Sequence, residues 1–326
     1  MKISATHIGK TILFSSFALI FLYFAFQHVD FSSFWTDIIQ ANYWWVALSL
    51  LFGLAGYILR AIRWNLLLEP LGYNPSKKNS FHAVVFGYFA NLAFPRLGEV
   101  ARCGVMNRTE KIPMDTLVGT VIVERIIDLI MLAVLTAITF SIKIQFFGSF
   151  ILQRIIIPTT QAISAHTYTL IIGVCILIIS AIILWKILGK TNVIRQKIGN
   201  FTKGIVQGIA SIYTVKQKPL FIIYTLLIWT MYWLMSWLVC FAIEPTSHFS
   251  ATDGLFLLIV GGIGMAVPVQ GGIGVFHFIV AQAITMYGLS QQTGLLYATI
   301  NHESQLLFII IMGCISSFYI FIAKKR

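Results

Sequence analysis

The sequence predicts an all-α fold: a polytopic helical membrane protein with two oppositely oriented re-entrant helical hairpins that form an inverted repeat. Hydrophobic residues make up 58% of the chain and charged residues only 10%, whereas a soluble domain carries about a quarter charged residues. Lysine and arginine collect between the apolar runs, and proline interrupts two of those runs. These features indicate a single integral membrane domain over residues 1–326.

Several apolar segments approach the roughly 20 residues that a helix needs to cross a bilayer. They are Ile12–Phe26, Trp44–Leu59, Leu117–Phe140, Thr169–Trp185, Leu220–Ile243 and Leu295–Ile322. We interpret the first as a membrane helix and not as a signal peptide, because no small-residue cleavage site follows it.

The basic residues predict the orientation of the chain, since lysine and arginine mark cytoplasmic loops. The connection from Trp185 to Leu220 is rich in both, whereas Gln27–Tyr43 and Glu244–Asp253 contain neither. We therefore expect both termini in the cytoplasm and the protein in the cytoplasmic (inner) membrane of a bacterium. Isoleucines at helical spacing predict a cytoplasmic amphipathic helix over residues 189–218.

Two further apolar segments are broken by proline. Phe81–Phe94 is too short to cross a bilayer and stops at Pro95, and Gly254–Gly288 is interrupted by Pro268. If each segment enters the membrane and returns, every strongly basic loop stays on the cytoplasmic side. The first hairpin then enters from the cytoplasm and the second from outside. The alternative is that proline and glycine merely kink two ordinary helices.

The two breaks share a short motif. Ala93–Gly98 and Ala266–Gly271 both read A-x-P-x-x-G. Opposite entry and a shared motif favour an inverted repeat, a recurring transporter design, with repeats over about 43–140 and 219–322. We expect half-helices over Leu97–Asn107 and Gly272–Tyr287, whose free N–H groups suit an anion, and one site flanked by both breaks.

Charged residues also lie within the apolar segments, where they normally face a cavity or a partner. Glu124, Arg125 and Asp128 share the third segment, and Arg60 and Arg63 end the second. Arg60 and Arg63 either anchor the helix at the cytoplasmic surface or bind a lipid phosphate. The acidic residues form either a functional network or a structural cluster with Arg60, Arg63 or Arg102, and Glu99 balances Arg96 or Arg102.

The last segment carries His302 and Glu303. His302 either titrates near neutral pH or bonds a neighbouring helix, and His277 of the second hairpin has the same two alternatives. The four cysteines are scattered singly, so we expect no metal site, and we also expect no cofactor and no catalytic residue. The net charge of +12 is explained by membrane orientation and anionic headgroups, which leaves no reason to expect nucleic acid as a partner.

Several of these stretches resemble the lysylphosphatidylglycerol synthase transmembrane-region family: Phe86–Asn91, Pro95–Arg102, Glu124–Asp128, Arg60–Trp64 and Pro268–Gly274. In its best-known members a soluble aminoacyl-transferring domain is joined to a membrane unit regarded as a flippase. This chain looks like a stand-alone member without the soluble domain. By resemblance the motif positions are Arg96, Gly98, Glu99, Arg102, Glu124, Arg125 and Asp128.

These observations predict a lipid flippase or transporter that moves a phospholipid or lipid-linked headgroup between leaflets. The expected partners are membrane lipids with anionic or lipid-linked headgroups, and a separate lipid-modifying enzyme is a candidate. The predicted headgroup-binding residues are Arg60, Arg63, Arg96, Gly98, Glu99, Arg102, Pro268, Gly271 and Gly272. The predicted intramembrane charge network is Glu124, Arg125, Asp128, His302 and Glu303.

Because no nucleotide-binding motif is present, transport is expected to be facilitated or ion-coupled, with Glu124, Asp128 or Glu303 as proton carriers. Two alternatives remain open. One is a membrane-embedded transferase with a lipid-linked donor, in which Asp30 or Asp37 supplies a carboxylate. The other is a small-solute secondary transporter.

Overall fold

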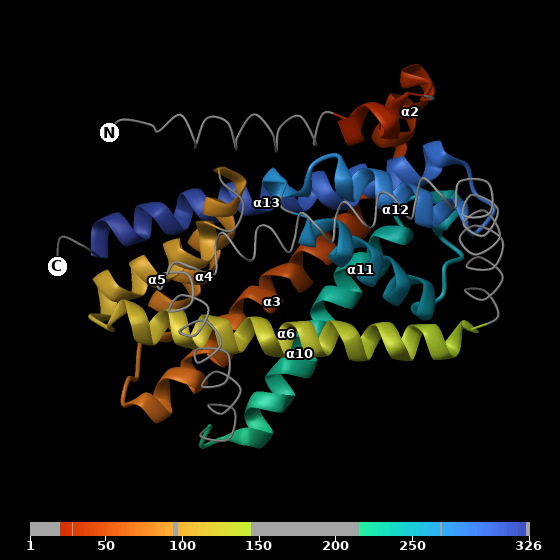
Figure 1. The fold of residues 1–326 in the computed structure, drawn as a ribbon. Helices are drawn as coiled ribbons and strands as arrows, with labels where there is room; N and C mark the ends of the chain where they lie inside the picture. The colour runs from red at the N-terminus through yellow and green to blue at the C-terminus, as the bar shows by residue number, and fades with distance from the viewer. Residues whose placement is uncertain (1–19, 28, 94–96, 145–214, 268, 324–326) are drawn as a thin grey trace, which may run out of the picture. The chain divides into compact units, whose positions relative to one another are not determined.

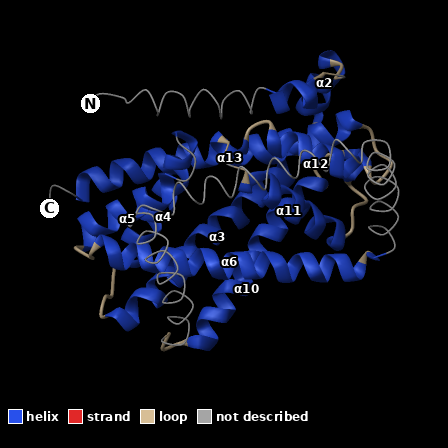
Figure 2. Ribbon diagram, viewed as in Figure 1, coloured by secondary structure: helices blue, strands red, loops and turns tan. Residues whose placement is uncertain are grey.

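The computed structural model describes residues 20–27, 29–93, 97–144, 215–267 and 269–323. All regular elements in these ranges are helices (Figures 1 and 2), which confirms the all-α prediction. Most of Ile12–Phe26, all of Thr169–Trp185 and residues 189–214 lie outside the described residues. The described residues up to Thr136 and from 215 onward belong to one compact unit, and residues 137–144 belong to a second. All contacts given below lie within the first unit.

Three described helices are long and apolar enough to cross a membrane by length and composition. They are α3 (Tyr43–Leu68), α10 (Lys218–Cys240) and α13 (Gln291–Ala323), and each contains most of a predicted segment. The third predicted segment forms α6 (Met114–Ile142). The chain is therefore a multi-pass helical protein, as predicted. Helix α3 runs beyond the predicted Leu59 to Leu68, and Arg60 and Arg63 are buried within it.

Each proline break separates two helices that pack against each other (Figure 1). The first pair is α4 (Lys77–Ala93) and α5 (Leu97–Glu110), and the second is α11 (Ala251–Ala266) and α12 (Val275–Thr285). Helices α4 and α11 end at the alanine that opens each A-x-P-x-x-G motif. A residue before proline is disfavoured in helical geometry, which explains why both helices stop at this position.

The second half-helix begins later than predicted. Gly271 and Gly272 have φ of 59° and 76° and form the short 3-10 helix η5 (Gln270–Gly272). Positive φ is the region that glycine tolerates best, so these residues make a turn and helix α12 begins only at Val275. The first half-helix begins at Leu97 as predicted and runs on to Glu110.

The two halves of the unit repeat one order of elements: a long helix, two short helices around a break, and a long helix. The first long helices of both halves, α3 and α10, pack side by side. A Cβ at Gly313 of α13 would collide with Phe89 of α4, and a Cβ at Gly262 of α11 would lie 3.7 Å from Leu132 of α6. The short helix before each break thus contacts the last helix of the other half. This pattern agrees with a repeat, and its inversion across a bilayer stays a prediction.

A buried tryptophan positions the charged part of α5 over α3. Trp64 of α3 is fully buried, and its Nε1–H donates to Thr120 Oγ1 of α6 at 2.9 Å. The guanidinium of Arg102 lies over the same ring, 4.6 Å from its centroid. Since aromatic faces attract guanidinium groups, Trp64 fixes both α6 and Arg102 relative to α3.

Candidate functional site

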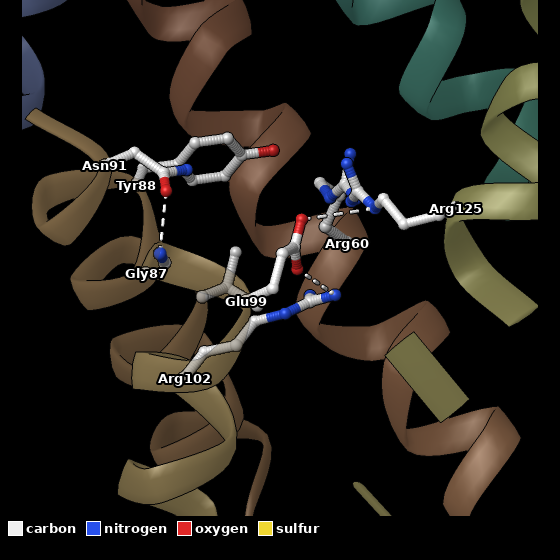
Figure 3. A pocket seen from close by; sticks show the side chains of 9 residues that line it. Arg60, Gly87, Tyr88, Asn91, Glu99, Arg102 and Arg125 are labelled. Carbon is white, nitrogen blue, oxygen red and sulfur yellow. Dashed lines mark hydrogen bonds and ion pairs between the residues drawn. The ribbon is translucent and has the colours of Figure 1, made fainter. Parts of the chain in front are cut away.

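A pocket of about 60 Å³ lies beside the first break, between α3, α4, α5 and α6 (Figure 3). A water molecule needs roughly 10–15 Å³ of such space, so the pocket accepts a few waters or a small anionic group. Its lining is Arg60, Val84, Gly87, Tyr88, Asn91, Gly98, Glu99, Arg102 and Arg125. Of the predicted headgroup-binding residues, Arg60, Gly98, Glu99 and Arg102 therefore line one pocket.

Two glycines bring α4 and α5 together at the base of this pocket. A Cβ on Gly87 would lie 2.9 Å from the Gly98 carbonyl oxygen, and a Cβ on Gly98 would collide with the Gly87 carbonyl. The Gly98 N–H donates to Asn91 Oδ1 at 2.7 Å. The sequence predicted that N–H groups at the start of this half-helix would be free for an anion. At Gly98 the chain itself supplies the acceptor.

Behind the pocket, Arg60 and Arg63 pair with two acidic residues of α6. Arg60 Nη2 is 3.0 Å from Asp128 Oδ2 and also pairs with Glu124, and Arg63 Nη2 is 2.8 Å from Asp128 Oδ1. Arg102 Nη1 is 3.1 Å from Glu124 Oε2. Arg60 and Arg63 are 3% and 0% exposed, so the surface-anchor alternative is wrong for both. Their carboxylate partners hold them in the interior.

At the rim of the pocket, Glu99 bridges two arginines. Glu99 Oε2 is 3.0 Å from Arg102 Nη2, and Glu99 Oε1 is 3.3 Å from Arg125 Nε. Figure 3 shows the Glu99 carboxylate pointing between these two guanidinium groups. Arg125 also pairs with Asp128 at 3.3 Å, since residues three apart on a helix are neighbours. Glu99 and Arg125 are partly exposed, with 32% and 43% of their side chains accessible, so the rim is the accessible side of the site.

The described cluster carries an excess of positive charge. Four guanidinium groups (Arg60, Arg63, Arg102 and Arg125) face three carboxylates (Glu99, Glu124 and Asp128), which leaves one positive charge uncompensated. Among the described residues, Arg60 Nε and Arg102 Nε are also buried without a hydrogen-bond acceptor. Both arginines line the pocket. A buried N–H of a charged group without a partner costs about 1–3 kcal/mol or more, so the site favours an anion or ordered water.

Uncharged side chains hold Arg60 and Arg63 in place. Arg60 Nη1–H donates to the Tyr232 hydroxyl at 3.1 Å, and that hydroxyl is 3.3 Å from the hydroxyl of Tyr88. Arg63 Nη1–H donates to Thr225 Oγ1 at 3.3 Å. Tyr232 and Thr225 lie on α10, so the second half of the chain contributes to the site at the first break. Sequence reasoning missed these residues because a tyrosine or threonine in an apolar helix gives no local signal.

Asn91, Gly87 and Tyr88 were also missed as site residues. Gly87 and Asn91 lie four positions apart on α4 and therefore share a face, which is the one signal that the spacing offers.

The other predicted residues lie elsewhere. Arg96 and Pro268 are outside the described residues. Gly271 and Gly272 do not line the pocket; they contact a second group, in which His302 Nε2 is 2.7 Å from the Gly271 carbonyl oxygen and His302 Nδ1 is 3.0 Å from Glu303 Oε1. The predicted charge network is thus divided between the two breaks.

The two breaks are nevertheless neighbours. A Cβ at Gly271 would lie 3.6 Å from Leu92 Cδ2, next to the end of α4, and η5 packs on α4. The groups at the first and second break therefore lie on either side of one helix end.

Comparisons with known proteins agree with the resemblance noted in the sequence. The family described as "Lysylphosphatidylglycerol synthase TM region" matches residues 10–313. A UPF0104 membrane protein of Methanocaldococcus jannaschii is 30% identical over 131 residues, which cover 39% of this chain and 38% of that protein. The aligned part thus spans less than half of that relative. No solved structure matches.

Proposed function

The chain belongs to the lysylphosphatidylglycerol synthase transmembrane-region family, and from that premise we propose that it moves a lipid with an anionic, phosphate-containing headgroup between membrane leaflets. The pocket at the first break is the proposed headgroup site. The proposal includes three predictions from the sequence: membrane lipids are the partners, the protein lies in the bacterial cytoplasmic membrane, and both termini are in the cytoplasm.

One observation carries the proposal: the described cluster has one uncompensated positive charge beside a pocket lined by Arg60, Arg102 and Arg125. A phosphodiester carries one negative charge and would neutralise this excess. Arginine is well suited to phosphate because its planar fork presents paired N–H donors. The acceptor-free Nε groups of Arg60 and Arg102 are candidates to donate to phosphate oxygens.

The apolar surface beside the rim supports a lipid over a water-soluble anion. On α6, Leu129 lies four positions after Arg125 and Val118 seven before it, so all three share a face. Leu129 is 67% exposed and Val118 39%. In a bilayer such a face contacts acyl chains, so a headgroup could reach the rim while its tails stay in the lipid.

Glu99 is the proposed gate of this site. It occupies the guanidinium groups of both Arg102 and Arg125 and is partly exposed, so an incoming phosphate would compete with it for the same donors. Glu124 is fully buried and pairs with Arg60, Arg63 and Arg102. We therefore assign Glu124 and Asp128 to holding the arginines and not to carrying protons. Alternating access by rocking of the two repeats is kept from the sequence-based hypothesis.

A reconstitution assay tests the proposal. Purified full chain is placed in liposomes with a fluorescent phosphatidylglycerol or phosphatidylcholine, and the fraction in the inner leaflet is followed with a membrane-impermeant quencher. We expect the wild type to accelerate exchange of the anionic lipid, and Arg102→Ala to lose at least tenfold of that rate. Arg108→Ala is the matched control, because Arg108 is an exposed arginine on the same helix.

The same liposome preparation also tests the two alternative functions. A transferase would leave a new product detectable by mass spectrometry of the recovered lipids. In the structure Asp30, one of its candidate carboxylates, accepts from Ser32 N–H at 3.0 Å and caps helix α2 (Phe31–Gln40). A small-solute transporter would take up a water-soluble anion without lipid exchange. Equal lipid exchange in wild-type, Arg102→Ala and protein-free liposomes would contradict the proposed function.

A further inference from the structure

Two histidines and a glutamate meet at the second break. His277 lies on α12, and His302 and Glu303 are neighbours on α13. Glu303 Oε1 is 3.0 Å from His302 Nδ1 and 3.4 Å from His277 Nε2. Both histidines are buried, with 2% and 6% of their surface exposed. One carboxylate oxygen therefore faces a ring nitrogen of each histidine.

The backbone carbonyl of Gly271 fixes the position of one proton. His302 Nε2 is 2.7 Å from this oxygen, and a carbonyl oxygen only accepts hydrogen bonds, so Nε2 carries the hydrogen. In a neutral ring Nδ1 then presents a lone pair. It presents that lone pair to Glu303, whose carboxylate is also an acceptor. Two facing acceptors at this distance need a positively charged species to hold them together.

We propose that His277, His302 and Glu303 bind a divalent transition-metal ion of the zinc class. Two imidazole nitrogens and one carboxylate oxygen form a donor set that zinc uses, with the fourth position left to water or a ligand. The three ligand atoms lie within 4.8 Å of one another. Ligands bound about 2.1 Å from one tetrahedral ion lie roughly 3.4 Å apart, and small rotations of the side chains would bring the longest of these separations to that distance.

The surroundings of His302 match those of a metal-bound histidine. A metal-bound histidine usually donates its other N–H to a carboxylate or a backbone carbonyl, as His302 does to Gly271. His277 Nδ1 is buried and makes no hydrogen bond within the described part of the chain. His277 therefore lacks the second hydrogen bond that orients His302, and it would bind the ion through Nε2, the nitrogen that faces Glu303.

The glycines of the break place the orienting carbonyl. Gly271 and Gly272 have positive φ, and a Cβ at Gly272 would collide with the Met265 thioether and lie 3.8 Å from His302 Nε2. An ion at this site would link α12 to α13 and, through His302, hold the turn η5. The Glu303 side chain is 42% exposed, so the free coordination position is accessible from that side.

A protonated His302 is the rival explanation, because an imidazolium donates from both ring nitrogens and satisfies the same distances. The two explanations differ in whether the purified protein binds zinc. Sequence reasoning predicted no metal site because His277 and His302 are far apart in the chain and meet only through packing of α12 on α13.

The test measures zinc on the full chain in detergent. Protein purified with a histidine-free affinity tag is stripped with a chelator, equilibrated with Zn²⁺ and analysed by elemental mass spectrometry. Co²⁺ in place of Zn²⁺ reports the coordination geometry through its visible absorption. We expect about one ion per wild-type chain and at least tenfold weaker binding in His302→Ala and Glu303→Gln. His248→Ala, which removes an exposed histidine, should bind like the wild type.

Glu303→Gln keeps the measurement interpretable, because it preserves the size of a partly exposed side chain and is expected to fold. Elution volume and thermal unfolding of the stripped proteins confirm this. Equal zinc occupancy in the wild type and in Glu303→Gln, or none in either, would overturn the metal site in favour of a protonated His302.

Discussion

Gly87 and Gly98 lie back to back across the first break, so close that a Cβ on Gly98 would collide with the Gly87 carbonyl. This contact sets the distance between α4 and α5, and hence the width of the pocket that both residues line. The pair explains why small residues stand at these two positions of the hairpin.

Gly98→Ala should therefore destabilise the protein by about 1–3 kcal/mol, the usual range for overpacking. The added methyl group meets backbone and the Asn91 amide, neither of which moves without disturbing α4 or the start of α5. The measurement is thermal unfolding in detergent. Gly104→Ala is the control on the same helix, where a Cβ meets nothing within 4 Å and alanine should be neutral or stabilising by up to about 1 kcal/mol. Equal unfolding temperatures for both variants would contradict this account.

Glu124→Gln should destabilise the protein strongly, by about 3–5 kcal/mol, because it leaves buried guanidinium groups without their counter-charge. Glu124 is fully buried between Arg60, Arg63 and Arg102. The double variant Arg60→Met with Glu124→Leu removes one charge of each sign. Its loss in free energy of unfolding should be smaller than the sum of the losses in the two single variants. Strict additivity in this cycle would show that the two residues do not depend on each other.

Two substitutions of Asn91 distinguish the structural role of the first break from its role in binding. Asn91→Ala removes the acceptor of the Gly98 N–H and should cost about 1 kcal/mol, as the loss of a helix cap does. Asn91→Asp keeps an acceptor oxygen but adds a negative charge to the pocket. This variant should keep the wild-type unfolding temperature. Because the added charge repels an anionic headgroup, it should bind the lipid more weakly and change the rate of lipid exchange in liposomes. Loss of stability in Asn91→Asp, or unchanged exchange, would contradict this assignment.

The helical segments and their breaks were predictable, because they follow from local rules. An apolar run of membrane length and a proline that ends a helix can both be read from neighbouring residues, and α4 and α11 each end two residues before the proline that was predicted to break the segment. The start of α12 was not predictable, since it depends on the positive φ of Gly271 and Gly272.

The site was predictable only in part. Glu124 drew attention because charge is expensive in an apolar helix, and Arg102 and Glu99 because they follow the first break. Arg102 does pair with both carboxylates. Tyr232 and Thr225 reach the arginines from α10, and His277 meets Glu303 across α12 and α13. Such contacts between distant segments depend on packing, which leaves no pattern within a single stretch of sequence.

Glu99 provides the sharpest test of the proposed headgroup site. Its carboxylate neutralises part of the charge of Arg102 and Arg125 at the rim. Glu99→Gln would raise the excess of the described cluster by one positive charge and free donors of both arginines. We expect it to bind an anionic phospholipid about tenfold more tightly, which corresponds to about 1.4 kcal/mol, and to release it more slowly, so that maximal exchange falls.

Binding of a fluorescent phosphatidylglycerol to the detergent-solubilised protein measures the first effect, and exchange in liposomes measures the second. Asp37→Asn is the charge-matched control, because Asp37 is an exposed acidic residue outside the site and its loss changes the net charge equally. If Glu99→Gln and Asp37→Asn tighten binding to the same extent, the effect is one of net charge and Glu99 is not the gate. If only Glu99→Gln tightens binding, and salt weakens that gain, the phosphate competes with Glu99 for the same guanidinium groups.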